Sequence, residues 1–165
     1  MITITISGLQ LGIYIDCAIS DINGNGRDEL VIAYRGLDGH PELLIANKGW
    51  GTRAFNAYAR YLETDFTLTD DKSVAVTTGD FDGDGDDEIA LAVESDESAG
   101  TYLAVYDVED GSIVKKDSLL VPASYNSLVN RLDIASGDMD GDGNDEIVAT
   151  TYYHRIDLID VNATT

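Results

Sequence analysis

The sequence predicts an all-β fold built of β-propeller blades, and three observations predict it. An aspartate-rich loop occurs three times at nearly constant spacing, short strand-like segments lie between the loops, and helix signals are weak throughout. Sixteen glycines supply turns, whereas proline occurs only twice. Frequent Val, Ile, Thr and Tyr favour many short strands joined by turns. We expect a single repeat domain over residues 1–165.

The repeat is defined by loops over residues 21–30, 80–89 and 138–147, which we name loop one, loop two and loop three and number from position 1 to position 10. Their starts lie 59 and 58 residues apart, and self-similarity at such a period is typical of propellers and other repeat folds. The residues six and four places before each loop are apolar: Ile15, Cys17, Val74, Val76, Leu132 and Ile134. We therefore expect these positions to lie in the core and the single thiol, Cys17, to be buried and inert.

Strand patterns between the loops give four strands per repeat, which is the pattern of a propeller blade. Apolar strands follow the loops at 30–34, 88–94 and 147–151, and alternation favours a strand over 53–63. Further strands are expected at 101–108, 112–121, 128–136 and 155–161. The third repeat lacks its outermost strand, which residues 1–7 could supply. The prediction is thus three four-stranded antiparallel blades, half or a fragment of a propeller of about six to eight blades.

The loops carry oxygen donors in the order that a short loop needs to wrap a hard cation such as Ca²⁺. Side chains at positions 1, 3, 5 and 9 and a backbone carbonyl at position 7 are the predicted ligands. Glycines at positions 4 and 6 permit the tight reversals. The predicted ligand residues are Asp21, Asn23, Asn25, Arg27 and Glu29; Asp80, Asp82, Asp84, Asp86 and Glu88; Asp138, Asp140, Asp142, Asn144 and Glu146, with Arg27, Asp86 and Asn144 contributing backbone oxygen only.

Two other interpretations of the loops fit the sequence less well. An EF-hand needs a bidentate Glu at position 12, where Ile32, Leu91 and Ala149 stand. Plain hairpin turns with solvated acids would explain one loop, but three copies, each followed by a strand, favour a metal site. The closing carboxylate comes from position 9, which we favour, or from position 8: Asp28, Asp87 and Asp145.

The three loops differ in charge. Loop one has only two carboxylates among its predicted ligands, Asp21 and Glu29, beside two neutral Asn residues, whereas loops two and three have four each. We expect loop one to bind calcium most weakly, and loops two and three to be disordered or partly protonated without metal.

Residues 78–89 and 135–147 resemble the core motif of the FG-GAP and VCBS repeats, found in integrin α-chain propellers and in many bacterial secreted proteins. The resemblance implies structural calcium at the blade loops and an extracellular or cell-surface location, although this chain shows no signal peptide. Loop one departs from the motif, with Ser20 where the other copies have Gly79 and Gly137.

Three blades cannot close a ring, so the expected partners are a second copy that completes a six-bladed ring or the rest of a longer propeller. A net charge of −21 argues against nucleic acid as a partner, and the sequence lacks an apolar run long enough for membrane insertion. Calcium and a protein or glycan ligand are the remaining expected partners.

The sequence favours a non-enzymatic calcium-binding module for extracellular adhesion or recognition. One alternative is a carbohydrate-binding lectin that uses aromatic side chains, for which the candidates are Trp50, Tyr125, Tyr152 and Tyr153. Another is the propeller part of a polysaccharide-active enzyme. Against catalysis, His40 and His154 lie in turn-like segments, and no Gly-x-Ser-x-Gly motif is present.

Overall fold

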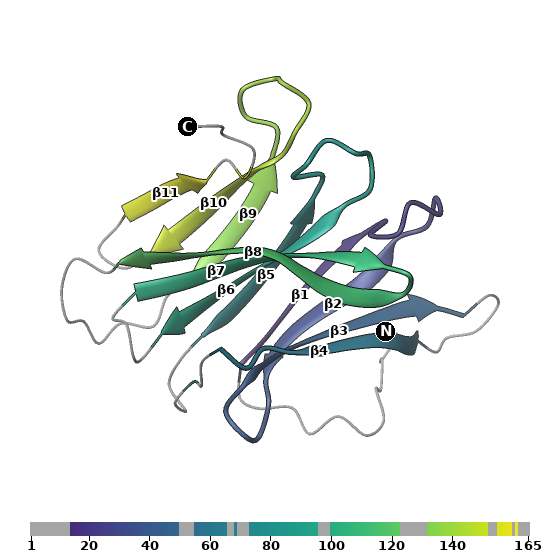
Figure 1. Cartoon of the computed structure of the whole chain (residues 1–165), viewed down its shortest axis with the longest axis horizontal. Helices are drawn as coiled ribbons and strands as arrows, with labels where there is room; N and C mark the ends of the chain where they lie inside the picture. The colour runs from purple at the N-terminus through teal and green to yellow at the C-terminus, as the bar shows by residue number, and fades with distance from the viewer. Residues whose placement is uncertain are drawn as a thin grey trace, which may run out of the picture.

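The computed structural model describes residues 14–49, 55–65, 68, 73–95, 100–122, 132–151, 155–159 and 161. Within these residues the protein is all-β, as predicted: strands form three antiparallel sheets, and no residue lies in a helix (Figure 1). Accordingly, the described part of the chain offers no helix that could cross a membrane.

Each sheet is a meander in which strands that follow each other in sequence also pair in space. The first sheet contains β1 (Ile15–Ser20), β2 (Glu29–Arg35), β3 (Pro41–Lys48) and β4 (Phe55–Leu62). The second contains β5 (Val74–Gly79), β6 (Glu88–Ser95), β7 (Gly100–Glu109) and β8 (Ser112–Pro122). The third contains β9 (Asp133–Gly137), β10 (Glu146–Thr151) and β11 (Arg155–Ile159). These sheets have the size and topology of propeller blades.

The expected strands agree with this topology, including the strand read from alternation at 53–63, which is β4. β9 begins at Asp133, and residues 128–131 of the strand expected there lie outside the described residues. The third sheet shows three strands in the described part of the chain. Residues 1–7, expected to add its fourth strand, also lie outside it, so that expectation stays a prediction.

The sheets stack in the order of the chain, with β1, β5 and β9 neighbouring one another along the stack (Figure 1). One hydrophobic core lies between the first and second sheets and includes Val31, Leu43 and Leu91. Another lies between the second and third sheets and includes Ala90, Leu103 and Ile147. The middle sheet is therefore buried on both faces, which explains why β6 has apolar residues at successive positions.

The prediction that Ile15 and Cys17 lie in the core is wrong. The Cys17 thiol is exposed, and Ile15 is 53% exposed. The counterparts of Cys17, which are Val76 and Ile134, are buried because the second and third sheets each pack against the sheet before them. The corresponding face of the first sheet is turned away from the stack, so an apolar pattern that is buried in two copies is exposed in β1.

Candidate metal centre

The three loops leave the same edge of the stack and lie in a row (Figure 1). Each connects the first two strands of its sheet, and strand pairing sets where the loop closes. The residue before position 1 pairs with the position 9 glutamate: Ser20 with Glu29, Gly79 with Glu88, and Gly137 with Glu146. Position 9 is thus the first residue of a strand, held at the base of its loop.

In loops two and three, the position 1 aspartate accepts hydrogen bonds from two backbone amides across the loop. Asp80 Oδ1 and Oδ2 accept from Gly83 N at 2.7 Å and Gly85 N at 3.1 Å. Asp138 makes the same pair of bonds at 2.7 and 3.2 Å. The turn requires positive φ at both glycines of loop two, 77° at Gly83 and 95° at Gly85, which explains glycine at positions 4 and 6.

The carboxylates at positions 3 and 5 are oriented by backbone amides two residues ahead. In loop two, Asp82 Oδ1 accepts from Asp84 N at 3.2 Å and Asp84 Oδ1 accepts from Asp86 N at 2.9 Å. Asp140 and Asp142 accept the equivalent bonds in loop three at 3.0 and 2.9 Å. Each bond is an Asx turn that fixes one oxygen of the carboxylate.

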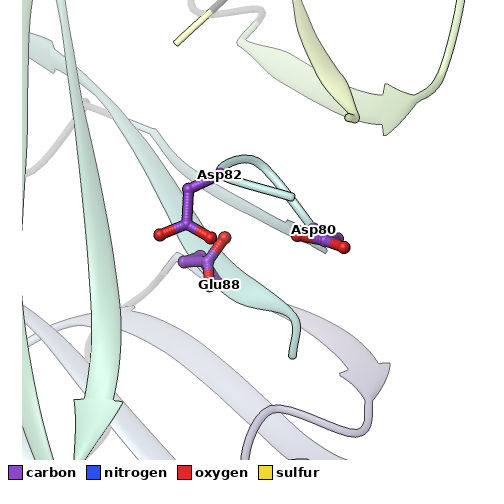
Figure 2. A group of neighbouring side chains, drawn as sticks. All are labelled: Asp80, Asp82 and Glu88. Atoms are coloured by element: carbon purple, nitrogen blue, oxygen red, sulfur yellow. The ribbon is translucent and has the colours of Figure 1, made fainter. Parts of the chain in front are cut away.

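The position 9 glutamates are buried beneath the loops. Oε2 of Glu88 accepts a hydrogen bond from Phe81 N, and Oε2 of Glu146 accepts one from Met139 N, both at 2.8 Å. In loops two and three, carboxylate oxygens at positions 1, 3 and 9 lie within 4.8 Å of one another: Asp80, Asp82 and Glu88; Asp138, Asp140 and Glu146. Figure 2 shows the Asp82 and Glu88 carboxylates facing each other, with Asp80 set apart from them at the start of the loop. Asp84 and Asp142, at position 5, are outside these groups.

Loop two places negative charge where it is costly. Burial, which leaves Glu88 only 3% exposed, is the main cause that raises the pKa of this carboxyl to about 8. The amide of Phe81 lowers the pKa, while the nearby Asp82 and Asp84 carboxylates raise it further. A buried carboxyl with other carboxylates near it favours protonation or a bound cation. The donor set is all oxygen, which suits calcium more than a soft metal.

In loop one Asp21 also accepts from two backbone amides, Asn25 N at 3.0 Å and Gly26 N at 2.6 Å, but the bonds at positions 3, 5 and 9 differ from those of the other loops. The side-chain amide of Asn25 donates to Asn23 Oδ1, and to Glu29 Oε1 at 3.4 Å. Asn23 Nδ2 donates to the Tyr58 hydroxyl at 3.3 Å. Glu29 is buried, burial raises its pKa, and its Oε2 atom has no hydrogen-bond partner among the described residues. Two amides therefore close this loop where the other loops use carboxylates.

Positions 7 and 8 face the preceding blade, a role that the sequence reasoning missed. Asp87 N donates to the carbonyl of Asp21 at 3.4 Å, and Asp145 N donates to that of Asp80 at 2.8 Å. A Cβ atom built on Gly79 would lie 2.4 Å from Asp145 Oδ2. The aspartate common to position 8 of all three loops was the available signal. Position 8 therefore couples neighbouring loops, whereas position 9 lies with positions 1 and 3 of its own loop.

The candidates for rival functions are mostly outside the described residues: Trp50, Tyr125, Tyr152, Tyr153 and His154. His40 lies in the turn between β2 and β3, where its N–H donates to Asp38 Oδ1 at 3.1 Å and its carbonyl accepts from Gly36 N at 2.8 Å. The sequence prediction of a turn residue at His40 is thus confirmed.

Comparison with known families adds one match. Residues 21–91 match the model of the FG-GAP-like repeat. The matched segment begins at position 1 of loop one and ends within β6, two residues beyond loop two. The predicted resemblance is confirmed for this segment. A search among curated proteins found no match.

Proposed function

We propose that this chain, which carries an FG-GAP-like repeat over residues 21–91, is a non-enzymatic calcium-binding propeller module for adhesion or recognition outside the cell. Calcium is structural in this proposal. It holds the loops at one edge of the blades, and binding of a partner is the task of the assembled surface. FG-GAP-like repeats are usually extracellular and typically non-catalytic, which supports both parts of the proposal.

The observation that carries the proposal is the repeated group of three carboxylates. Positions 1, 3 and 9 converge within 4.8 Å in two loops that lie 58 residues apart in sequence and share the same hydrogen bonds. Convergence of like charges without a cation costs free energy, so its repetition at equivalent positions supports a common ligand. The hydrogen bonds at positions 3 and 9 use one oxygen of each carboxylate and leave the other for a cation that takes six to eight oxygen ligands.

The position 9 carboxylate closes the site in this proposal. Glu88 and Glu146 belong to the three-carboxylate groups, whereas the position 8 amides bond to the preceding loop. Of the predicted side-chain ligands, Asp84 and Asp142 would have to move toward the group, because they lie outside it. Loop one, where Glu29 Oε2 has no hydrogen-bond partner among the described residues, is the third and weakest site.

Calorimetric titration of the full chain with CaCl₂ tests the proposal. We expect two tight sites and one weak site. Asp80→Asn and Asp138→Asn should each remove one tight site, because amide oxygen replaces a charged ligand. Asp110→Asn, in the β7–β8 turn, is the matched control: it removes the same charge from a residue with φ of 50°, which Asn adopts readily, and should retain both sites. Absence of calcium binding by the wild-type chain would refute the proposal.

A further inference from the structure

The first and third sheets each leave one face outside the stack. We call the face that a sheet turns toward the preceding sheet its upstream face, and the opposite one its downstream face. The described part of the chain contains two complete junctions between a downstream and an upstream face. The upstream face of the first sheet and the downstream face of the third remain uncovered at several positions that are buried within those junctions.

The downstream face of the third sheet exposes large apolar side chains at core positions. At position 2 of the loops, Ile22 and Phe81 are each 1% exposed, whereas Met139 is 65% exposed. By strand register, Ile156 on β11 matches Leu103 on β7. Leu103 is 2% exposed against the third sheet, whereas Ile156 is 69% exposed. The third sheet therefore exposes the apolar face that a blade junction would bury, and no described sheet covers it.

The upstream face of the first sheet shows the complementary pattern. Ile19 is 66% exposed and Ile15 is 53% exposed. The position that matches Ile19 in the third sheet is Ser136, whose hydroxyl donates to the Thr78 carbonyl of the sheet before it at 2.7 Å. The same strand position therefore touches the preceding sheet at the junction that the third sheet makes, and β1 offers isoleucine there.

Contacts between loops also differ between the internal junctions and the open downstream face of the third sheet. At each internal junction the side chain at position 7 lies against the position 4 glycine of the preceding loop. A Cβ atom on Gly24 would lie 2.0 Å from Asp86 Oδ1, and one on Gly83 would lie 2.2 Å from Asn144 Oδ1. A Cβ atom on Gly141, the third glycine of this series, would have no described neighbour within 4 Å. Gly137, the counterpart of Gly79, is open in the same way.

The charges of the loops indicate which position 7 side chain suits the space over Gly141. The anionic Asp86 lies over Gly24, which is flanked by two neutral Asn residues, and the neutral Asn144 lies over Gly83, which is flanked by two Asp residues. Gly141 is also flanked by two acids, Asp140 and Asp142. The remaining position 7 residue of this chain is Arg27, the only cation in the series. An arginine over two carboxylates is a complementary pair at a junction.

We propose that the upstream face of the first sheet binds the downstream face of the third sheet in a second copy of this chain. Two such junctions, related by a twofold axis, close a ring of six blades. At each junction Arg27 lies over Gly141 of the other copy, and the amide of Asp28 donates to the Asp138 carbonyl, as Asp87 and Asp145 donate within the chain. This inference rests on the blade fold and does not require that calcium binds.

The mass of the full chain in solution tests the proposal, measured by light scattering at an ionic strength that screens the charge of −21 per copy. We expect about 36 kDa, twice the 17.8 kDa of one chain. Ile19→Asp and Ile156→Asp should each give monomers, because each places a charge on one of the two faces at both junctions of the dimer. Both side chains are exposed, so each variant should retain the wild-type circular dichroism spectrum.

Mixing the two variants distinguishes this junction from a symmetric one. In a dimer of one copy of each variant, one junction has two unchanged faces and the other has both substitutions. The mixture should therefore regain part of the dimer. A junction between two identical faces would be broken by one variant only and would overturn the proposal. A wild-type monomer would also overturn it and would favour blades from a longer chain as the occupant, while open filaments would exclude the closed ring.

Arg27→Gln tests the charge argument. We expect dimer dissociation to become at least about tenfold more favourable than in the wild type. Lys116→Gln is the matched control, because it removes the same charge from β8, where Lys116 pairs with Asp107 and Glu109 of its own sheet. Equal effects of the two variants would overturn the pairing. A dimer that binds no calcium would refute the proposed function alone, and a monomer that binds calcium would refute this inference alone.

Discussion

Loop one and loop two have the same length, the same strand register and the same glycines, but they are held together by different chemistry. In loop one, side-chain amides of asparagine both donate and accept, so Asn25 bonds directly to Asn23 and Glu29. In loop two, ionised carboxylates can only accept, so each relies on a backbone amide and the carboxylates repel one another. Loop one can close by itself, whereas loops two and three gain most from a cation.

Of the predicted effects, removal of calcium should give the largest difference between loop one and the other two loops. A site filled at about 100 times its dissociation constant contributes about 3 kcal/mol to the free energy of unfolding. We expect chelator to lower the urea midpoint and to increase amide hydrogen exchange in loops two and three. Exchange in loop one should change little, because its amide network needs no metal. Equal gains of exchange in all three loops would contradict the distinction.

Neutralising one closing glutamate at a time should show which loops bind calcium tightly. Glu88→Gln and Glu146→Gln should each weaken one tight site about 100-fold, equivalent to about 2.7 kcal/mol, because each removes a charge from a three-carboxylate group. Glu29→Gln should leave both tight sites unchanged. Calcium titrations of the three variants make this comparison, and loss of a tight site in Glu29→Gln would refute the order of affinities.

The free energy of unfolding of the calcium-free protein should depend on pH, because ionising the buried Glu88 destabilises the folded state. The pKa of Glu88 is about 8 in the folded protein, above its ordinary value of 4.5. A raised pKa means that the protonated folded form is favoured, so its stabilising effect is complete below pH 4.5 and is lost as the pH rises toward 8. The expected slope is roughly 1.4 kcal/mol per pH unit in this window.

Urea unfolding with chelator across this window measures that slope. Glu88→Gln should remove the contribution of Glu88 to the slope of unfolding free energy against pH. The raised pKa of Glu29 adds a smaller pH dependence of the same sign. Saturating calcium should reverse the trend, because protons then compete with the metal for the carboxylates. A calcium-free protein more stable at pH 8 than at pH 5 would contradict the argument.

The sequence predicted the blades and loops well because each depends on local chemistry. Strand alternation and turn residues located β4 and the β7–β8 hairpin, and loop spacing located the acids that converge at Asp80, Asp82 and Glu88. Position 9 could be preferred over position 8 because a strand was predicted to begin at position 10; in the structure the strands begin at position 9.

What could not be predicted depends on which sheet lies against which face. Cys17 has the same place in its repeat as the buried Val76, yet it is exposed because no sheet of the described chain precedes the first. The contacts of position 7 with the preceding loop also depend on blade stacking. A pattern within one repeat gives the same residue environment in every copy, whereas the ends of a stack differ from its middle.

The smallest expected effect comes from making loop one resemble loop two. Asn25→Asp adds a third carboxylate, which should raise the calcium affinity of loop one about tenfold, or about 1.4 kcal/mol. Without calcium the same change removes the amide donor to Asn23 and adds repulsion from Glu29 and from Asp86, whose carboxylate lies against Gly24. We therefore expect the calcium-free protein to lose about 1 kcal/mol of unfolding free energy. Ser118→Asp, an exposed change on β8, adds the same charge and should do neither. If Asn25→Asp stabilised the calcium-free protein, the amide network would not be what closes loop one.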